Sequence, residues 1–169
     1  NMTDQDIADL WVYFRSIPKS TTPSIDHDLP IYIRWRRPLA FWKLLNKREP
    51  RIDLVSSDAM IQRGAYLVET LGHCGECHTS RNFIGGLKYG YWLGGAKNPS
   101  GRGMIPNLTP AKLTWNTEEI VEYLTSGFTP DFDVAGGHMV DVIENTSKLT
   151  DEDRLAIAKY LKAIPEVQK

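Results

Sequence analysis

The feature that most constrains this chain is the pentapeptide Cys74-Gly75-Glu76-Cys77-His78. The C-x-x-C-H spacing predicts covalent attachment of a c-type haem, with two thioether bonds and one imidazole ligand to the iron. Two thiols one helical turn apart can reach the two vinyl groups of one porphyrin, and the next residue then places an imidazole nitrogen under the iron. We therefore expect a fold that is built around one large flat cofactor.

Two other uses of paired cysteines fit this sequence less well. A thioredoxin-like pair would stand between a strand and a helix with a proline-rich flank, and a structural zinc site would need a second pair of ligands. Cys74 and Cys77 are the only cysteines, and His27 and His73 are badly spaced to complete a zinc site. The sequence favours haem c bound through Cys74 and Cys77, with a redox dithiol or a chance match as the alternatives.

Length and charge are consistent with this prediction but do not identify the protein. The chain has 169 residues, and 41% of them are hydrophobic, which is typical of a globular protein. Its formal net charge of −1 predicts neither nucleic-acid binding nor binding to a membrane surface. The charge is uneven, because residues 31–51 are basic and the stretch after Thr114 is acidic. Such runs are usually solvated faces, and a docking role is the alternative.

The sequence also bears on the location of the protein. No apolar stretch approaches the roughly 20 residues that span a bilayer, and no signal peptide opens the chain, so we expect that the sequence begins after a processing point. Covalent haem attachment takes place outside the bacterial cytoplasm. The motif therefore predicts the periplasm, or the periplasmic face of the inner membrane.

A helical pattern occurs at both ends of the chain. Residues 2–18 align without gaps with residues 149–165, and a tyrosine stands at the same place in each copy. Each copy predicts a helix with Thr3 or Thr150 as N-cap, an acidic residue three positions later and a proline after the last turn. The alternative is that capped helices simply resemble each other.

The repeat leads to a hypothesis about domains. If residues 149–165 close a haem domain, residues 1–18 should be the closing helix of a preceding haem domain whose body lies outside this sequence. The chain would then be a fragment of a protein with at least two haems. We expect the missing domain or another chain to cover the apolar face of this helix, which includes Leu10, Phe14 and Ile17.

The middle of the chain predicts a connector followed by one haem domain. Residues 19–51, rich in proline, tryptophan and arginine, indicate an interdomain connector with one short helix at Leu39–Asn46. Because its aromatic side chains need burial, we expect residues 31–51 to pack against the haem domain and the N-terminal helix. Residues 52–169 form the predicted domain with one covalent haem.

The haem domain is predicted to be all-α, with irregular loops between its helices. A helix over residues 57–71, capped by Ser57 or Asp58, should run into the haem motif. A short helix over residues 117–126 should follow a capping box of Asn116 and Glu119. Glycine-rich segments at 84–104 and 127–145 predict irregular loops, the first of which wraps a cofactor edge.

The second axial ligand to the iron must come from a distant part of the chain. Electron carriers with His/Met ligation suggest a methionine, and Met139 follows two glycines that would let the backbone approach a porphyrin. Met104 and the neighbouring His138 are the alternatives, and a His/His site would have a lower reduction potential. Met139 could otherwise be a core residue.

These motifs together resemble the class I cytochrome c family. More narrowly, their order is similar to the multihaem (dihaem or trihaem) cytochrome c subunits of bacterial membrane-bound alcohol, gluconate and related dehydrogenases. The resemblance covers about two thirds of the chain, and the N-terminal helix matches the end of another such domain. The residues that carry it are Gly64-Ala65-Tyr66-Leu67, Cys74 to Thr79, Ile105 to Pro110, Trp115, Gly137-His138-Met139 and the helix Leu149 to Pro165.

The resemblance implies roles for individual residues. The carbonyl of Pro106 would accept a hydrogen bond from the proximal imidazole of His78, and Gly64 would lie where the helix before the motif crosses the closing helix near Tyr160. The resemblance also implies that the haem propionates are bound by Trp115, Arg81 and Tyr89 or Tyr91. The alternative for each of these residues is ordinary packing.

The expected function is electron transfer without a substrate pocket. The protein would relay single electrons between a dehydrogenase or another donor and quinone or a terminal oxidase, and we expect no independent catalysis. The alternative is a catalytic dihaem enzyme, such as a thiosulfate-oxidising one. An exchangeable sixth position at the iron would favour the enzyme, and full His/Met ligation would favour the relay.

Overall fold

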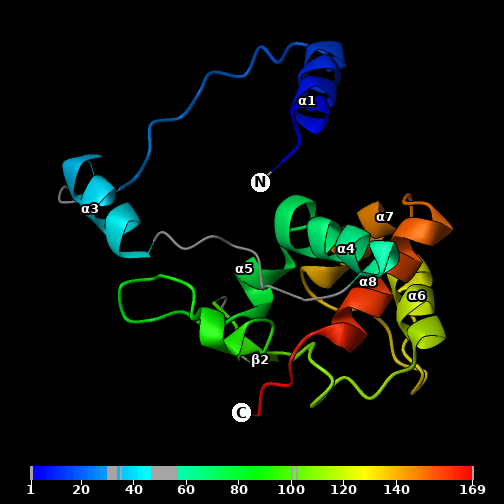
Figure 1. Cartoon of the computed structure of the whole chain (residues 1–169). Helices are drawn as coiled ribbons and strands as arrows, with labels where there is room; N and C mark the ends of the chain where they lie inside the picture. Colours follow the sequence, from blue (N-terminus) through cyan, green and yellow to red (C-terminus); the bar gives the residue numbers. More distant parts are fainter. Residues whose placement is uncertain are drawn as a thin grey trace. The chain divides into compact units, whose positions relative to one another are not determined.

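The computed structural model describes residues 2–29, 34, 36–46, 57–99, 101 and 103–168. The chain divides into two units, residues 1–49 and 50–169, which we describe separately. Helices dominate both, as Figure 1 shows, and this agrees with the all-α expectation. One short antiparallel pair of strands, in the second unit, was not anticipated.

The first unit contains the helices α1 (Asp4–Ser16) and α3 (Arg36–Asn46). The Thr3 side chain accepts a hydrogen bond from the backbone N–H of Asp6 at 3.1 Å, which confirms it as the N-cap of α1. α3 begins three residues earlier than the predicted helix and ends at the same residue. The sequence predicts that residues 31–51 pack against other parts of the chain. Part of this segment, residues 31–33, 35 and 47–51, lies outside the described residues.

The second unit holds a bundle of short helices joined by irregular segments. Its strands pair antiparallel, with Ala96 opposite Ile105. The elements in chain order are α4 (Ala59–Ala65), the π-helix η1 (Tyr66–Leu71), α5 (Cys74–His78), the 3₁₀ helix η2 (Tyr89–Tyr91), β1 (Ala96–Lys97), β2 (Met104–Ile105), α6 (Thr117–Ser126), α7 (Met139–Thr146) and α8 (Asp151–Ala163).

The centre of this unit is the crossing of α4 with α8, which lie against each other in Figure 1. A Cβ atom on Gly64 would stand 2.0 Å from the carbonyl oxygen of Ala156 and 2.7 Å from the Cβ of Tyr160. Only glycine fits there, so the two backbones pack more closely than side chains would permit. This confirms the predicted position of Gly64 beside Tyr160.

The ends of the helices follow the local sequence signals. The Asp58 side chain caps α4, and Asn116 and Glu119 form the complete capping box of α6. Thr150 caps α8 through a 3.2 Å hydrogen bond from the backbone N–H of Asp153. α6 stops at Gly127, whose φ of 81° lies in the left-handed region that favours glycine.

Two expectations about the backbone are wrong in detail. The segment 127–145 is not irregular throughout, because α7 begins at Met139; Val140 and Ile143 give it an apolar side, and Ile143 is buried against the core. The helix predicted over 57–71 changes type at Tyr66, where wider π-type turns lead to a 2.6 Å bond from the N–H of Gly72 to the carbonyl of Leu67. Single π-turns of this kind often stand next to functional sites.

Among the described residues, no helix is both long and apolar enough to cross a membrane.

Candidate haem-attachment site

The C-x-x-C-H motif forms α5, a single helical turn that follows η1 after Gly72 and His73. His73 begins it with a left-handed backbone, φ 50° and ψ 31°. Cys74 is half-buried, Cys77 is exposed, and the His78 side chain is buried. One turn of helix therefore presents both thiols and the imidazole together, as covalent haem attachment requires.

The imidazole of His78 is held by the segment that the sequence singled out. Its Nδ1 lies 2.8 Å from the carbonyl oxygen of Pro106, as the resemblance implied. A carbonyl can only accept, so Nδ1 carries the proton and Nε2 keeps a lone pair for a metal. Burial lowers the pKa of His78, and the bond to Pro106 partly opposes that shift, so the ring is neutral near pH 7.

A close backbone contact places Pro106 opposite the motif. The N–H of Gly95 donates to the carbonyl of His78 at 2.8 Å, and Gly95 then leads into β1. Gly95 has a φ of +82°, and a Cβ there would stand 2.9 Å from the carbonyl oxygen of Ile105. The glycine lets β2 and the following residue, Pro106, approach the haem motif.

The environment of the cysteines argues against the redox-dithiol alternative. Burial raises the pKa of the Cys74 thiol to about 11. A redox-active C-x-x-C pair needs a thiolate, and hence a lowered pKa, in its more reactive cysteine. The raised pKa of Cys74 does not fit such a pair.

A buried hydrogen-bonded network next to the motif was not predicted. The Tyr160 hydroxyl donates to Oε1 of Glu69 at 2.6 Å, and Nε1–H of Trp92 donates to the Tyr160 oxygen at 3.1 Å. The Trp92 ring also lies against the motif, since a Cβ on Gly75 would come within 2.1 Å of it. The one signal in the sequence was Glu69, an acidic residue inside the apolar run of η1.

The candidates for the second axial ligand differ in exposure. Met139 is the first residue of α7 and is half-buried, with its side chain against the hydrophobic core. Met104 in β2 is 65% exposed, and His138 is exposed. No described atom outside the neighbouring residues lies within 4 Å of where a Cβ of Gly136 or Gly137 would stand. The lower exposure of Met139 is consistent with its proposed role as the second axial ligand, which stays a prediction.

The predicted propionate partners already make contacts within the protein. Arg81 donates to the carbonyl of Gly85 at 2.8 Å and pairs with the Glu76 carboxylate. Tyr89 stacks on Trp92 with ring centroids 5.9 Å apart, and Trp115 meets Tyr123 edge-on at 5.2 Å. Tyr91 is 44% exposed. The role of these four residues toward a propionate stays a prediction.

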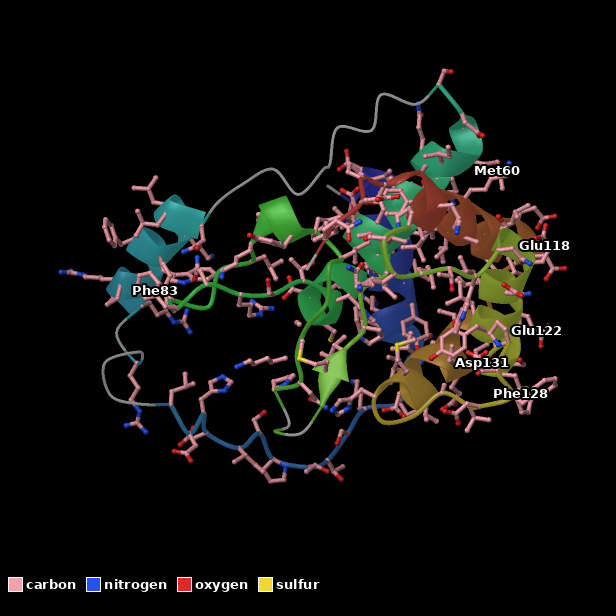
Figure 2. All side chains as sticks on the ribbon, turned by 90° about the horizontal axis from the view of Figure 1, so that it is seen from below. Met60, Phe83, Glu118, Glu122, Phe128 and Asp131 are labelled. Carbon is pink, nitrogen blue, oxygen red and sulfur yellow. The ribbon has the colours of Figure 1, made fainter. Side chains whose placement is uncertain are left out.

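The acidic run after Thr114 contributes to an open groove. Figure 2 shows Glu118, Glu122 and Phe128 along one edge of the second unit, with Asp131 nearby. The groove has a volume of about 390 Å³, and its lining residues are Asn116, Glu118, Glu119, Glu122, Phe128, Thr129 and Pro130. Glu118 and Glu122 of α6 are exposed, as expected of a solvated helix face, whereas the Glu119 carboxylate accepts the hydrogen bond of the capping box.

Comparison with known proteins connects this site to c-type cytochromes. No protein-family model matches the chain. The chain is 52% identical to a "Diheme cytochrome c-type" protein of Cereibacter sphaeroides, over 97% of the chain and 55% of that protein. It is 35% identical to the fructose dehydrogenase cytochrome subunit of Gluconobacter japonicus (97% and 35%), and 31% identical to the gluconate 2-dehydrogenase cytochrome c subunit of Pantoea cypripedii (96% and 40%).

The chain is therefore homologous to dihaem cytochromes c and to the cytochrome c subunits of dehydrogenases. It spans about half the length of the first of these relatives and little more than a third of the other two. Haem c is the cofactor, and the two thiols of α5 are the chain's only cysteines. The residues present fit this group, because one turn presents two thiols beside a neutral, oriented imidazole.

Proposed function

We propose that the chain is an electron-transfer module in which Cys74 and Cys77 hold haem c and His78 ligates the iron. The observation that carries this proposal is the 2.8 Å bond between His78 and Pro106, which leaves Nε2 free to coordinate a metal on the helical turn that bears both thiols. Haem c supplies one-electron chemistry when bound, through the ferric and ferrous states of its iron. The protein holds the imidazole in one tautomer and keeps it away from water.

The proposed sixth ligand is Met139. Met139 is half-buried and begins α7 one residue after Gly136 and Gly137, whereas Met104 is mainly exposed. In ferric protein, sulfur ligation gives a weak far-red charge-transfer band, as the cytochrome c resemblance implies. Met139→Ala should abolish this band, and the matched variant Met104→Ala should keep it. A band that survives Met139→Ala would assign the ligand to another residue.

The proposed role is a relay between a dehydrogenase or another donor and quinone or a terminal oxidase, at the periplasmic side of the inner membrane. Support for the donor comes from the printed names of the relatives, two of which are dehydrogenase subunits. The test is stopped-flow reduction of the purified holoprotein, followed by reoxidation with a quinone analogue. For a relay, added cyanide should change neither the rate of reduction nor the rate of reoxidation. Rapid cyanide binding with the wild-type ligands intact would favour a catalytic haem.

We further propose that α1 closes a second haem domain and that residues 19–51 connect it to the domain at 52–169. α1 and α8 have 13 residues each, and their threonine N-caps have φ/ψ of −69°/153° and −68°/158°. The alignment with the Cereibacter protein, whose name states two haems, covers 97% of the chain and so includes most of α1. A haemochrome count on the full-length protein should give at least two haems per polypeptide, and a count of one would contradict the proposal.

A further inference from the structure

The network of Glu69, Tyr160 and Trp92 places a carboxyl group in the protein interior next to the haem motif. The exposed fractions are 7% for Glu69, 0% for Tyr160 and 6% for Trp92. The 2.6 Å bond from the Tyr160 hydroxyl is donated to the carboxylate, and the Trp92 N–H satisfies the same hydroxyl from the other side. Burial alone disfavours the charged form of a carboxyl group, and the hydrogen bond that Tyr160 donates favours it.

This network adjoins the haem-attachment turn on two sides. The Trp92 ring occupies the space beside Gly75, between the two cysteines, so that no larger residue fits there. Glu69 lies in η1, which precedes α5, and a Cβ on Gly72, between these two helices, would stand 3.4 Å from the Cys74 sulfur. Burial raises the pKa of the Tyr160 phenol, and Glu69 and, to a smaller extent, Cys74 add to the rise. The network that holds the carboxylate therefore lies beside the first thioether position.

A buried charge acts on the haem more strongly than an exposed one. Reduction adds one electron to the iron, so a nearby negative charge disfavours the ferrous state and lowers the reduction potential. Water and salt screen this effect at the surface and screen it much less in the interior. The motif offers a direct comparison, because the carboxylate of Glu76 is 53% exposed and is paired with Arg81.

We propose that Glu69, held as a carboxylate by Tyr160, lowers the reduction potential of the haem attached at Cys74 and Cys77. The inference rests on the proposed electron-transfer function and goes beyond it, because it assigns the potential to a residue outside the C-x-x-C-H motif and the proposed sixth ligand. Tyr160 and Trp92 are positioning residues, since they act through Glu69 and through the fixed geometry of the turn.

The test is a mediated redox titration of the holoprotein, with dithionite as reductant and ferricyanide as oxidant. Glu69→Gln keeps the shape and removes the charge, and it should raise the potential. Glu76→Gln, the matched control, removes a charge in the motif itself and should produce a much smaller shift. The shift in Glu69→Gln should also persist from low to high ionic strength. A shift no larger than that of Glu76→Gln would overturn the proposal.

A second variant keeps the test decisive if Glu69→Gln fails to fold. Tyr160→Phe removes the hydroxyl, and with it both the bond to Glu69 and the acceptor of the Trp92 N–H. The carboxylate is then stabilised less, and the potential should again rise. In the double variant the two effects should not add, because both act on one charge. An unchanged potential in Tyr160→Phe with bound haem would contradict the proposal. A wild-type protein that attaches no haem would instead contradict the proposed function.

Discussion

The helices α1 and α8 have the same local signals and different surroundings. Both have 13 residues, a threonine N-cap and a C-cap in extended conformation, at Ile17 and Ile164. Yet α8 buries six of its residues and α1 buries none. The matched tyrosines show the contrast most clearly, since Tyr160 is 0% exposed and Tyr13 is 61% exposed.

The comparison separates what makes a helix from what makes a core. Caps and an apolar stripe define the first and last residues of a helix wherever it stands. Burial requires a partner of matching shape, and α8 has one in α4, where Gly64 admits the backbone at Ala156. The small residues Ala156 and Ala158 of α8 correspond to Asp9 and Trp11 in α1. Any partner of α1 must therefore accept a larger side chain than α4 does.

The largest expected effect comes from the α4–α8 crossing. Gly64→Ala would place a methyl group 2.0 Å from the Ala156 carbonyl oxygen, so the two helices would have to move apart. We expect a loss of more than about 3 kcal/mol in the free energy of unfolding, beyond the usual cost of overpacking. Urea denaturation of the holoprotein measures it. The control Gly90→Ala has open space at its Cβ and should lose far less. Equal losses would show that α8 does not depend on this contact.

Matched truncations in the two helices test the comparison directly. Ile157 in α8 is 7% exposed, and its counterpart Leu10 in α1 is 40% exposed. Ile157→Ala should lower the free energy of unfolding of the second unit by about 2 to 3 kcal/mol, through lost burial and a cavity. Leu10→Ala should leave that transition nearly unchanged. If both variants lower it equally, α1 contributes to the stability of the haem domain in this chain.

A smaller effect is expected at alkaline pH. The pKa of Tyr160 is raised in the folded protein, so above the ordinary value of 10.0 the unfolded chain loses this proton first. The stabilisation is therefore complete below pH 10 and falls by about 1.4 kcal/mol per pH unit above it. Tyr160→Phe lacks this loss, and the gap in unfolding free energy between wild type and variant should narrow from pH 9 to pH 11. A constant gap would mean that Tyr160 ionises equally in both states.

The smallest expected effect concerns the caps. Thr150→Ala should lower the free energy of unfolding of the second unit by about 1 kcal/mol, because the N–H of Asp153 loses its acceptor. Thr3→Ala removes the same cap from α1 and should reduce helical circular dichroism without moving that transition. A shift of the transition in Thr3→Ala would show that the formation of α1 is coupled to the haem domain.

Local signals determined much of this protein from the sequence alone. The C-x-x-C-H motif predicted the haem, and Thr3, Thr150 and the pair Asn116 and Glu119 predicted where helices begin. These features depend on residues a few positions apart, so their physics is contained in the sequence. The bond between His78 and Pro106, 28 positions apart, came instead from the resemblance to class I cytochromes c.

Only the tertiary structure decided the features that join distant parts of the chain. The bond from Tyr160 to Glu69 spans 91 positions, and that from Trp92 to Tyr160 spans 68. No local pattern indicates that an acidic residue in an apolar run will meet a tyrosine of the last helix. The crossing at Gly64 brings η1 and α8 together, and burial favours partners for polar groups such as the Tyr160 hydroxyl and the Trp92 N–H, since an unpaired one would cost free energy. The same packing explains why α8 is buried and α1 is exposed. Similar caps specify similar helices, but only α8 has a complementary neighbour that buries it.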